Sequence, residues 1–96
     1  ARGLHILGRI NVALGKYQPA TESFQSSIAL AETLNAEYEK GLALFYMGQM
    51  YSHLLEEKDY RRRCRQLLKK AAAIFGRLGA RSDLAQVTQL QTSLRL

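Results

Sequence analysis

The sequence has few of the residues that mark several classes of protein. Its 96 residues include one cysteine, one proline and no tryptophan. The single Cys64 cannot form an intramolecular disulfide, and the sequence has no secretory signal. Together these two observations favour a reducing cytoplasmic setting. No apolar run approaches the roughly 18 residues that a membrane-spanning helix requires. Because proline, glycine and serine do not cluster, linkers and disordered tracts are not expected.

The length and the apolar periodicity predict one small helical domain. A composition of 47% hydrophobic and 23% charged residues is typical of a soluble globular unit. Apolar side chains recur at intervals of three and four, which is the spacing of amphipathic helices. The start at Ala1 instead of methionine indicates a piece of a longer protein. We expect an all-α fold of about five helices, over residues 2–14, 18–34, 37–55, 59–78 and 81–96.

Each predicted helix has an apolar stripe, and small or polar residues mark its ends. Gly15, Asn35 and Gly79 are expected to end helices in the left-handed conformation, and Ser82 to cap the last helix. The inward residues of the first two helices are predicted to be Leu4, Leu7, Ile10 or Asn11, Leu14, Ala20, Phe24, Ser27, Ala31 and Leu34. Those of the last two are predicted to be Tyr60, Cys64, Leu67, Leu68, Ala71, Ile74, Phe75, Leu78, Leu84, Val87, Leu90 and Leu94.

The chain is similar to itself, which is the mark of a repeat protein. A shift of about 40 residues lays Leu44, Met47, Gly48 and Tyr51 over Leu4, Leu7, Gly8 and Asn11. For the following helices a shift of about 44 lays Cys64, Leu68, Ala71 and Phe75 over Ala20, Phe24, Ser27 and Ala31. These shifts predict a first repeat over residues 1–36, a second over 37–80 and a C-terminal capping helix over 81–96.

The segment LGRINVALGKYQPATESFQSSI, residues 7–28, resembles a tetratricopeptide repeat. The resemblance rests on the Leu7–Gly8 pair, the aromatic Tyr17, the small Ala20 and the aromatic Phe24. It implies antiparallel helical hairpins stacked as a short right-handed α-solenoid. Gly8 and Ala20 would lie where two helices approach most closely, with Phe24 and Leu7 filling the space beside them.

The sequence also departs from the pattern of this family. Asn11 stands where an aromatic residue is usual, the proline after the second helix is missing, and both units are longer than the common length. Elongated units of this kind are similar to those in the C-terminal arms of large bacterial signalling ATPases, cyclases and transcription activators.

The resemblance implies binding rather than catalysis. Stacked hairpins form a concave face, lined by the first helix of each unit, that accepts a peptide or a partner helix. The matching positions here are Arg2, His5, Arg9, Val12, Ala13, Leu42, Phe45, Gln49, Ser52 and His53. We therefore expect a protein-protein interaction scaffold from a larger signalling or regulatory protein. The alternative is that these residues are merely solvated or cover a neighbouring repeat.

No constellation of residues for an enzyme, a cofactor or a metal site is present in the sequence. His5 and His53 lack further ligands at a zinc spacing, and Cys64 lies on an apolar stripe that predicts a buried, inert thiol. The glycines do not form a phosphate-binding loop. We expect no enzymatic activity, no cofactor and no metal.

A basic stretch suggests a second function. The net charge is +6, and the segment KDYRRRCRQLLKK carries much of it. The residues predicted to point away from the Cys64 stripe are Arg62, Arg63, Arg65, Lys69, Lys70 and Arg77. This basic face would bind phosphate or nucleic acid, or it is a solvated helix surface balanced by Glu56, Glu57 and Asp59. Because no aromatic or amide side chains interleave with the cations to read bases, nucleic acid is the less favoured partner.

The number of predicted repeats raises the question of assembly. Two hairpins and a capping helix are fewer than the roughly three repeats that a solenoid usually needs. The polar Gln86, Gln89 and Ser93 predict a solvating cap at the C-terminal end. Ile6, Ile10 and Val12 are predicted to lie uncovered on the first helix, where a preceding repeat or a second copy would bury them. A homodimer through the first helix is therefore one expected state.

Overall fold

A computed structural model describes residues 3, 5–56 and 59–96, and its regular elements are all helices. They are α1 (Ile6–Ala13), α2 (Tyr17–Thr33), α3 (Glu37–Ser52), α4 (Tyr60–Leu78) and α5 (Arg81–Ser93). The predicted all-α class with five helices is confirmed. None of these helices, over the described part of the chain, is long and apolar enough to cross a membrane.

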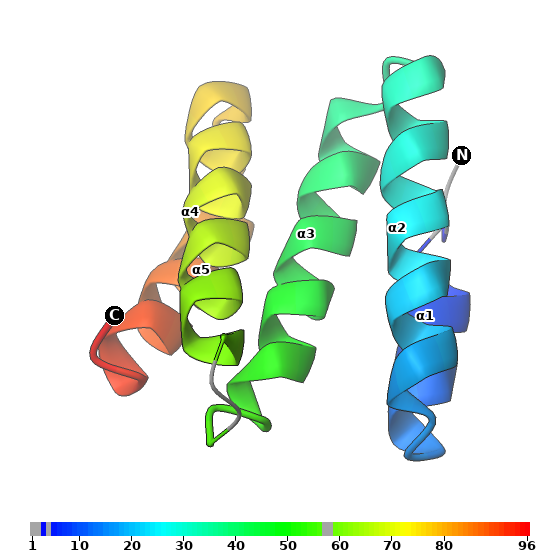
Figure 1. Cartoon of the computed structure of the whole chain (residues 1–96). Coiled ribbons are helices and arrows are strands. Elements are labelled where there is room, and N and C mark those ends of the chain that lie inside the picture. Colours follow the sequence, from blue (N-terminus) through cyan, green and yellow to red (C-terminus); the bar gives the residue numbers. More distant parts are fainter. Residues whose placement is uncertain (1–2, 4, 57–58) are drawn as a thin grey trace.

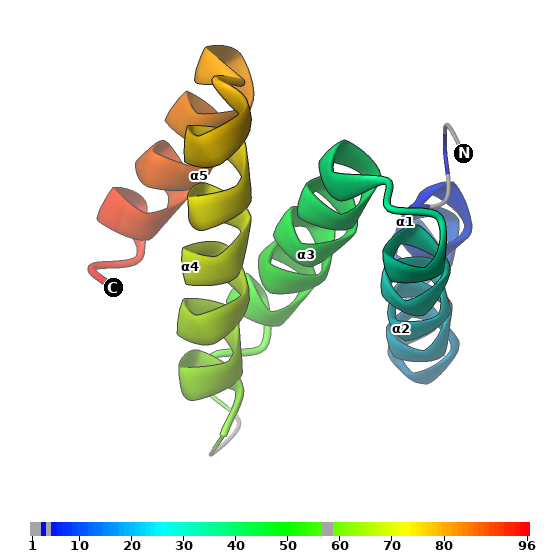
Figure 2. The same ribbon diagram turned by 90° about the horizontal axis from the view of Figure 1, so that it is seen from above.

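Neighbouring helices run antiparallel and pack in chain order (Figure 1). The α1–α2 pair forms one end of the molecule, α3 lies in the middle, and α4 with α5 forms the other end. Figure 2 shows α2 and α4 on one side of the molecule and α1 and α5 on the other, with α3 between them. The principal extents of the chain are 33 × 27 × 19 Å.

The turns after α1, α2 and α4 have the same construction. Gly15, Asn35 and Gly79 adopt φ values of 73°, 54° and 69°, as the sequence predicts. The next residue in each turn donates its N–H to a carbonyl five positions back, at 2.8 Å for Lys16, 2.8 Å for Ala36 and 2.9 Å for Ala80. This bond satisfies a carbonyl that the helix end would otherwise leave unpaired.

Three predicted helix ends and one predicted cap are wrong, and one of these ends is that of α5, which lies at Ser93 instead of residue 96. Gly3 has a φ of 84° and its carbonyl accepts from the N–H of Ile6, so a turn precedes α1, which begins at Ile6 instead of residue 2. At the end of α3, His53 and Leu54 donate to carbonyls three residues back, which tightens the chain into a turn before residue 55. Ser82 lies inside the first turn of α5 and forms no cap, because the turn at Gly79 leaves Ala80 as the residue before the helix.

The core is centred on α3, which is buried on several sides. Its buried apolar residues include Leu44, Met47 and Met50, and the inward stripes of α2 and α4 pack around them. The inward residues predicted for α2 and α4 that are buried are Ala20, Phe24, Ser27, Ala31, Cys64, Leu68, Ala71, Ile74 and Phe75. Leu34 and Leu78 are wrong predictions, with 52% and 45% of their surface exposed, and both lie at the C-terminal ends of their helices.

Glycines allow the closest approaches between helices. A Cβ atom added at Gly8 would lie 2.6 Å from the ring of Phe24, and one added at Gly48 would lie 2.9 Å from Leu68. Gly8 matches Gly48 and Phe24 matches Leu68 in the internal repeat, so the two hairpins contain the same contact. The predicted role of Gly8 and Phe24 at the helix contact is thereby confirmed.

The predicted orientation of α1 is wrong. Leu7 and Leu14, expected to face α2, are 59% and 62% exposed, and Leu4 lies outside the described residues. The close approach at Gly8 turns the side of Asn11 and Val12 toward the rest of the molecule instead. Asn11 donates an amide N–H to Ser23 Oγ at 3.3 Å, which accounts for a polar residue where the family has an aromatic one. Leu7 and Leu14 lie about 100° around the helix axis from the centre of the face that Asn11 and Val12 form.

We expect Gly8→Leu to lower the free energy of unfolding by about 1 to 3 kcal/mol or more, because the added side chain overlaps the Phe24 ring. Ala20→Leu, at a fully buried position, is expected to behave likewise. Gly76→Ala is the matched control: a Cβ there meets nothing within 4 Å, and alanine favours the helix by about 0.5 to 1 kcal/mol. Urea denaturation of the three variants measures these effects, and a wild-type stability for Gly8→Leu would contradict the packing.

Candidate partner-binding groove

A hollow of about 160 Å³ lies between α1 and α3. Its apolar lining includes the buried Phe24 and Met50 and the half-buried Val12 and Tyr46. Its exposed lining residues are Arg9, Ala13, Gln49 and His53. The hollow therefore combines an apolar floor with a polar rim that carries a guanidinium group and an imidazole.

A second hollow, of about 310 Å³, continues along the same side of the molecule between α3 and α5. Phe45 and Leu90 form its apolar part, and its other lining residues are Gln49, Gln86, Gln89 and Ser93. Gln49 lines both hollows, so they lie next to each other at this side chain. We call the two hollows together the α1/α3/α5 groove.

Aromatic contacts fix the orientation of Arg9 at the rim of this groove. The guanidinium carbon of Arg9 lies 4.2 Å from the centroid of the Tyr46 ring, which is a cation–π contact. The ring of His5 stacks on Tyr46 with centroids 5.0 Å apart and planes 10° apart. Phe45 meets Tyr46 edge-on at 5.2 Å. Because Tyr46 is held by these rings, Arg9 rests on a fixed surface instead of moving freely in solvent.

His5 is buried against α3 and does not line the groove. Its Nδ1 lies 3.6 Å from Oε2 of Glu39, within ion-pair range but too far for a hydrogen bond. Neither atom has a hydrogen-bond partner within the described residues. Burial lowers the pKa of His5, Glu39 acts to raise it, and the positive charge of Arg9 lowers it further. His5 therefore connects α1 to α3, and its prediction as an exposed contact residue is wrong.

The structure places five of the ten predicted contact residues in the first hollow: Arg9, Val12, Ala13, Gln49 and His53. Phe45 is only 6% exposed and belongs mainly to the core, although its edge reaches the second hollow. Leu42 packs half-buried against the core, and Ser52 donates its hydroxyl to the carbonyl of Gln49 at the end of α3. Arg2 lies outside the described residues. Apolar contacts between helices bury Phe45 and Leu42. The sequence-based prediction places them in the groove because the periodicity of α3 alone does not separate groove residues from core residues.

Several groove residues are missing from the sequence-based prediction. Tyr46 and Met50 are four residues apart on α3, so helical spacing places their side chains on one face of that helix. From the sequence, their size and apolar character fit either partner binding or burial in the core, so they are not among the predicted contact residues. Gln86, Gln89 and Ser93 are predicted as a solvating outer surface, but they line the groove. The sequence carries no signal for this, because their position depends on how α5 packs on α3 and α4.

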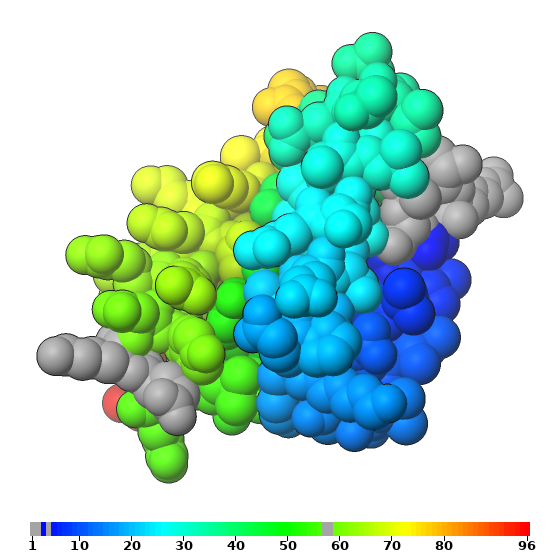
Figure 3. All heavy atoms as spheres, turned by 45° about the vertical axis from the view of Figure 1, so that its right-hand side comes forward, coloured from blue at the N-terminus to red at the C-terminus, as the bar shows by residue number. Residues whose placement is uncertain are grey.

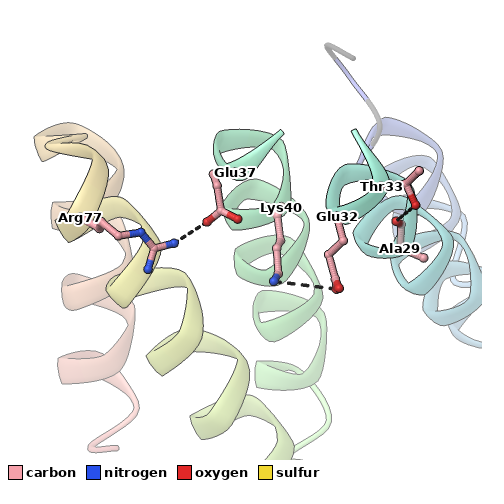
Figure 4. A network of polar contacts seen from close by, with 6 residues as sticks. All are labelled: Ala29, Glu32, Thr33, Glu37, Lys40 and Arg77. Atoms are coloured by element: carbon pink, nitrogen blue, oxygen red, sulfur yellow. Dashed lines mark hydrogen bonds and ion pairs between the residues drawn. The ribbon is translucent and has the colours of Figure 1, made fainter. Parts of the chain in front are cut away.

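The predicted basic face of α4 is divided by contacts within the molecule. Arg77 forms an ion pair with Glu37 of α3, and Figure 4 shows it beside the pair that Lys40 forms with Glu32 of α2 at 3.8 Å. The guanidinium carbon of Arg63 lies 5.8 Å from the centroid of the Tyr60 ring. The remaining predicted residues, Arg62, Arg65, Lys69 and Lys70, are exposed. The six residues therefore do not act as one free surface.

Cys64 is fully buried, and its thiol donates to the carbonyl of Gly48 at 3.3 Å. Burial raises the pKa of the Cys64 thiol, which keeps it protonated and unreactive, as its position on the apolar stripe predicts. Within the described ranges, no three His, Cys, Asp or Glu side chains lie together as metal ligands would.

The buried His5 predicts a loss of stability in mild acid. Because its pKa is below 6.5 in the folded chain, the unfolded chain binds a proton more readily as the pH falls through that value. The free energy of unfolding should therefore decrease from about pH 7 to about pH 5 more steeply for the wild type than for His5→Phe. The exposed His53→Phe is the matched control and should keep the wild-type slope. Equal slopes for wild type and His5→Phe in denaturant titrations at each pH would contradict this role.

A scan of protein-family models, a search of curated proteins and a search of solved structures each gave no match to this chain.

Proposed function

We propose that this chain is a tetratricopeptide-like scaffold that binds a peptide or a helix of a protein partner in the α1/α3/α5 groove. The observation that carries the proposal is the position of two neighbouring hollows, both lined by Gln49, which together extend over α1, α3 and α5. A partner segment lying along it would contact both repeats and the last helix at once. This is the mode by which stacked helical hairpins recognise extended or helical segments.

The repeated contacts within the chain support a solenoid architecture. The turns at Gly15, Asn35 and Gly79 have the same geometry, and the glycine contacts at Gly8 and Gly48 are equivalent. Each hairpin therefore presents its first helix to the same side, where α1 and α3 line the groove. On this interpretation the chain is part of a larger signalling or regulatory protein.

The first hollow fits one large apolar side chain of the partner. Cavities of about 150 Å³ admit a benzene ring, and this hollow of about 160 Å³ is open to solvent above the buried Phe24 and Met50. Inserting an apolar group would remove Val12 and Tyr46 from water, which is the main favourable term in such binding. The residue that docks is therefore expected to be aromatic or a large aliphatic side chain.

The groove also defines which polar groups its partner should carry. Among the residues that the structure describes, no carboxylate lines either hollow, whereas Arg9 and His53 supply positive or hydrogen-donating groups at the rim. Gln49, Gln86 and Gln89 offer both amide donors and carbonyl acceptors to a peptide backbone. Acidic side chains next to the apolar anchor are expected to improve specificity more than affinity, because exposed ion pairs contribute little.

We expect Gln49→Trp to weaken binding of a groove ligand about ten-fold or more, equivalent to about 1.4 kcal/mol, because the indole fills the junction of the hollows. The probe is a set of peptides selected on the wild-type chain from a displayed library of random dodecapeptides. Gln66→Trp, on an exposed glutamine of α4 outside the groove, is the control and should bind as the wild type does. Fluorescence anisotropy with each selected peptide measures both variants.

Two results would contradict the proposed groove. One is a library that yields no binder to the wild type, and the other is a set of peptides that bind Gln49→Trp and wild type equally. The stability of Gln49→Trp is measured in parallel, and its exposed position predicts an intact fold. Phe45→Ala would not serve this purpose, since truncating a 6% exposed core ring costs about 3 to 5 kcal/mol of stability.

A second candidate function is phosphate or nucleic-acid binding through α4. The observation that favours it is the spacing of Arg62, Arg65 and Lys69, which are exposed and recur at three and four residues along one side of the helix. None of the three takes part in an ion pair within the described residues. Such a surface attracts phosphates by charge alone, without reading bases.

This candidate is tested by binding to random duplex DNA and retention on heparin over a salt series. Phosphate binding requires an affinity that falls steeply as salt rises, with a logarithmic slope of about −0.9 for each phosphate neutralised. Arg62→Glu combined with Lys69→Glu should then abolish retention. An absence of binding at low salt would exclude the basic surface as a functional site.

A further inference from the structure

A large apolar surface covers the α1–α2 end of the molecule. Ile6, Leu7 and Ile10 of α1 are 48%, 59% and 49% exposed, and Leu30 of α2 is 44% exposed. A hollow of about 350 Å³ runs between the two helices at this end. Its lining residues are Leu7, Pro19, Glu22, Ser23, Ser26, Ser27 and Leu30. We call this surface the α1–α2 end face.

The internal repeat identifies the counterpart of this face in the second hairpin. The hollow between α3 and α4 is lined by Met47, Tyr51, Arg63, Gln66, Leu67 and Lys70, together with Gln25 of α2. The shift of 40 residues lays Met47 over Leu7. The shift of 44 residues lays four further lining residues of this hollow, Arg63, Gln66, Leu67 and Lys70, over Pro19, Glu22, Ser23 and Ser26 in that order. The two hollows are therefore the same feature of the repeat. Only the second has a helix of another hairpin, α2, beside it.

Burial differs between equivalent positions in the two hairpins. Leu7 is 59% exposed whereas its counterpart Met47 is 6% exposed, and Ile10 is 49% exposed whereas Met50 is 1% exposed. Met50 lines a hollow together with Val12 and Phe24 of the first hairpin, so the first hairpin helps to bury it. The end face thus consists of positions that the repeat buries when another helical hairpin packs on them.

We propose that a second copy of this chain covers the α1–α2 end face, the two copies pairing through the same face about a two-fold axis. Of nine large apolar residues exposed over the described ranges, seven belong to α1, α2 and the turns that end them. The exceptions are Tyr38 and Leu78. Since the exposed apolar residues gather at this end, the end face of one copy is best buried by the end face of a second copy. Pairing of the same surface on both copies is the arrangement of an isologous dimer.

Charge favours this way of pairing over other contacts between copies. The chain has a net charge of +6, but seven of its 14 basic residues lie in α4, at the opposite end from α1 and α2 (Figure 1). Glu22 is the single ionisable residue among those lining the end-face hollow. Figure 3 shows α1 and α2 side by side at this end, in blue to cyan, with α4 in yellow-green on the far side of α2. Pairing through the end face therefore keeps the basic helices of the two copies apart.

The test is sedimentation equilibrium of the full chain over a concentration series. The wild type is expected to dimerise, and Leu7→Glu or Ile10→Glu to raise the dimer dissociation constant about ten-fold or more, because each places unpaired carboxylates in an apolar contact. Leu78→Glu is the matched control, since Leu78 is 45% exposed on α4 away from the end face, and it should dimerise as the wild type does.

The thermal unfolding midpoint supplies an independent readout. It should rise with protein concentration for the wild type and Leu78→Glu, and not for Leu7→Glu, because dimerisation stabilises the folded chain by mass action. A wild type that stays monomeric at all concentrations would overturn the proposal. The end face would then be a surface for a helix from another source than a second copy of this chain. Equal loss of dimer in Leu7→Glu and Leu78→Glu would overturn it as well.

Discussion

The close approach of a glycine on one helix to a large apolar side chain on the next determines how this molecule is built. At Gly8 the Phe24 ring occupies the space of a Cβ atom, and at Gly48 the Leu68 side chain does the same. Side chains in a close-packed interior transmit such a contact to their neighbours, because there is little free volume to absorb a shift. The glycine contacts therefore set both the distance between paired helices and the rotation of each helix about its axis.

The rotation of α1 has two consequences at opposite sides of that helix. Turning Gly8 and Val12 inward brings Arg9 and Ala13 to the rim of the α1/α3/α5 groove, where Arg9 rests on Tyr46. The same rotation carries Leu7 away from the core and onto the end face. A single packing contact thus separates a polar-rimmed groove, suited to a peptide, from an apolar face, suited to a helical surface. The two proposed interactions use different sides of α1 and do not compete.

Helix α3 is the element that both proposals and the core depend on. It packs against α2 and α4, contacts α1, and supplies Gln49 to both hollows of the groove. Such a helix has little surface free to vary, which explains why residues 41–48 in its middle are all apolar residues or glycine. The contact at His5 differs from the rest of the core, because His5 packs on α3 by stacking its ring on Tyr46, beside the buried Glu39, instead of by apolar packing alone.

The sequence by itself determined the local structure, which consists of the five helices and the turns at Gly15, Asn35 and Gly79. These follow from spacing, left-handed backbone preference and side-chain size, which act over a few residues. Tertiary packing decided which side of α1 faces inward, that Phe45 and His5 are buried, and that Gln86 and Gln89 line the groove. Periodicity gives positions around one helix but not the rotation of that helix against its neighbours. That rotation depends on contacts between residues far apart in the chain, such as Gly8 with Phe24 and His5 with Tyr46.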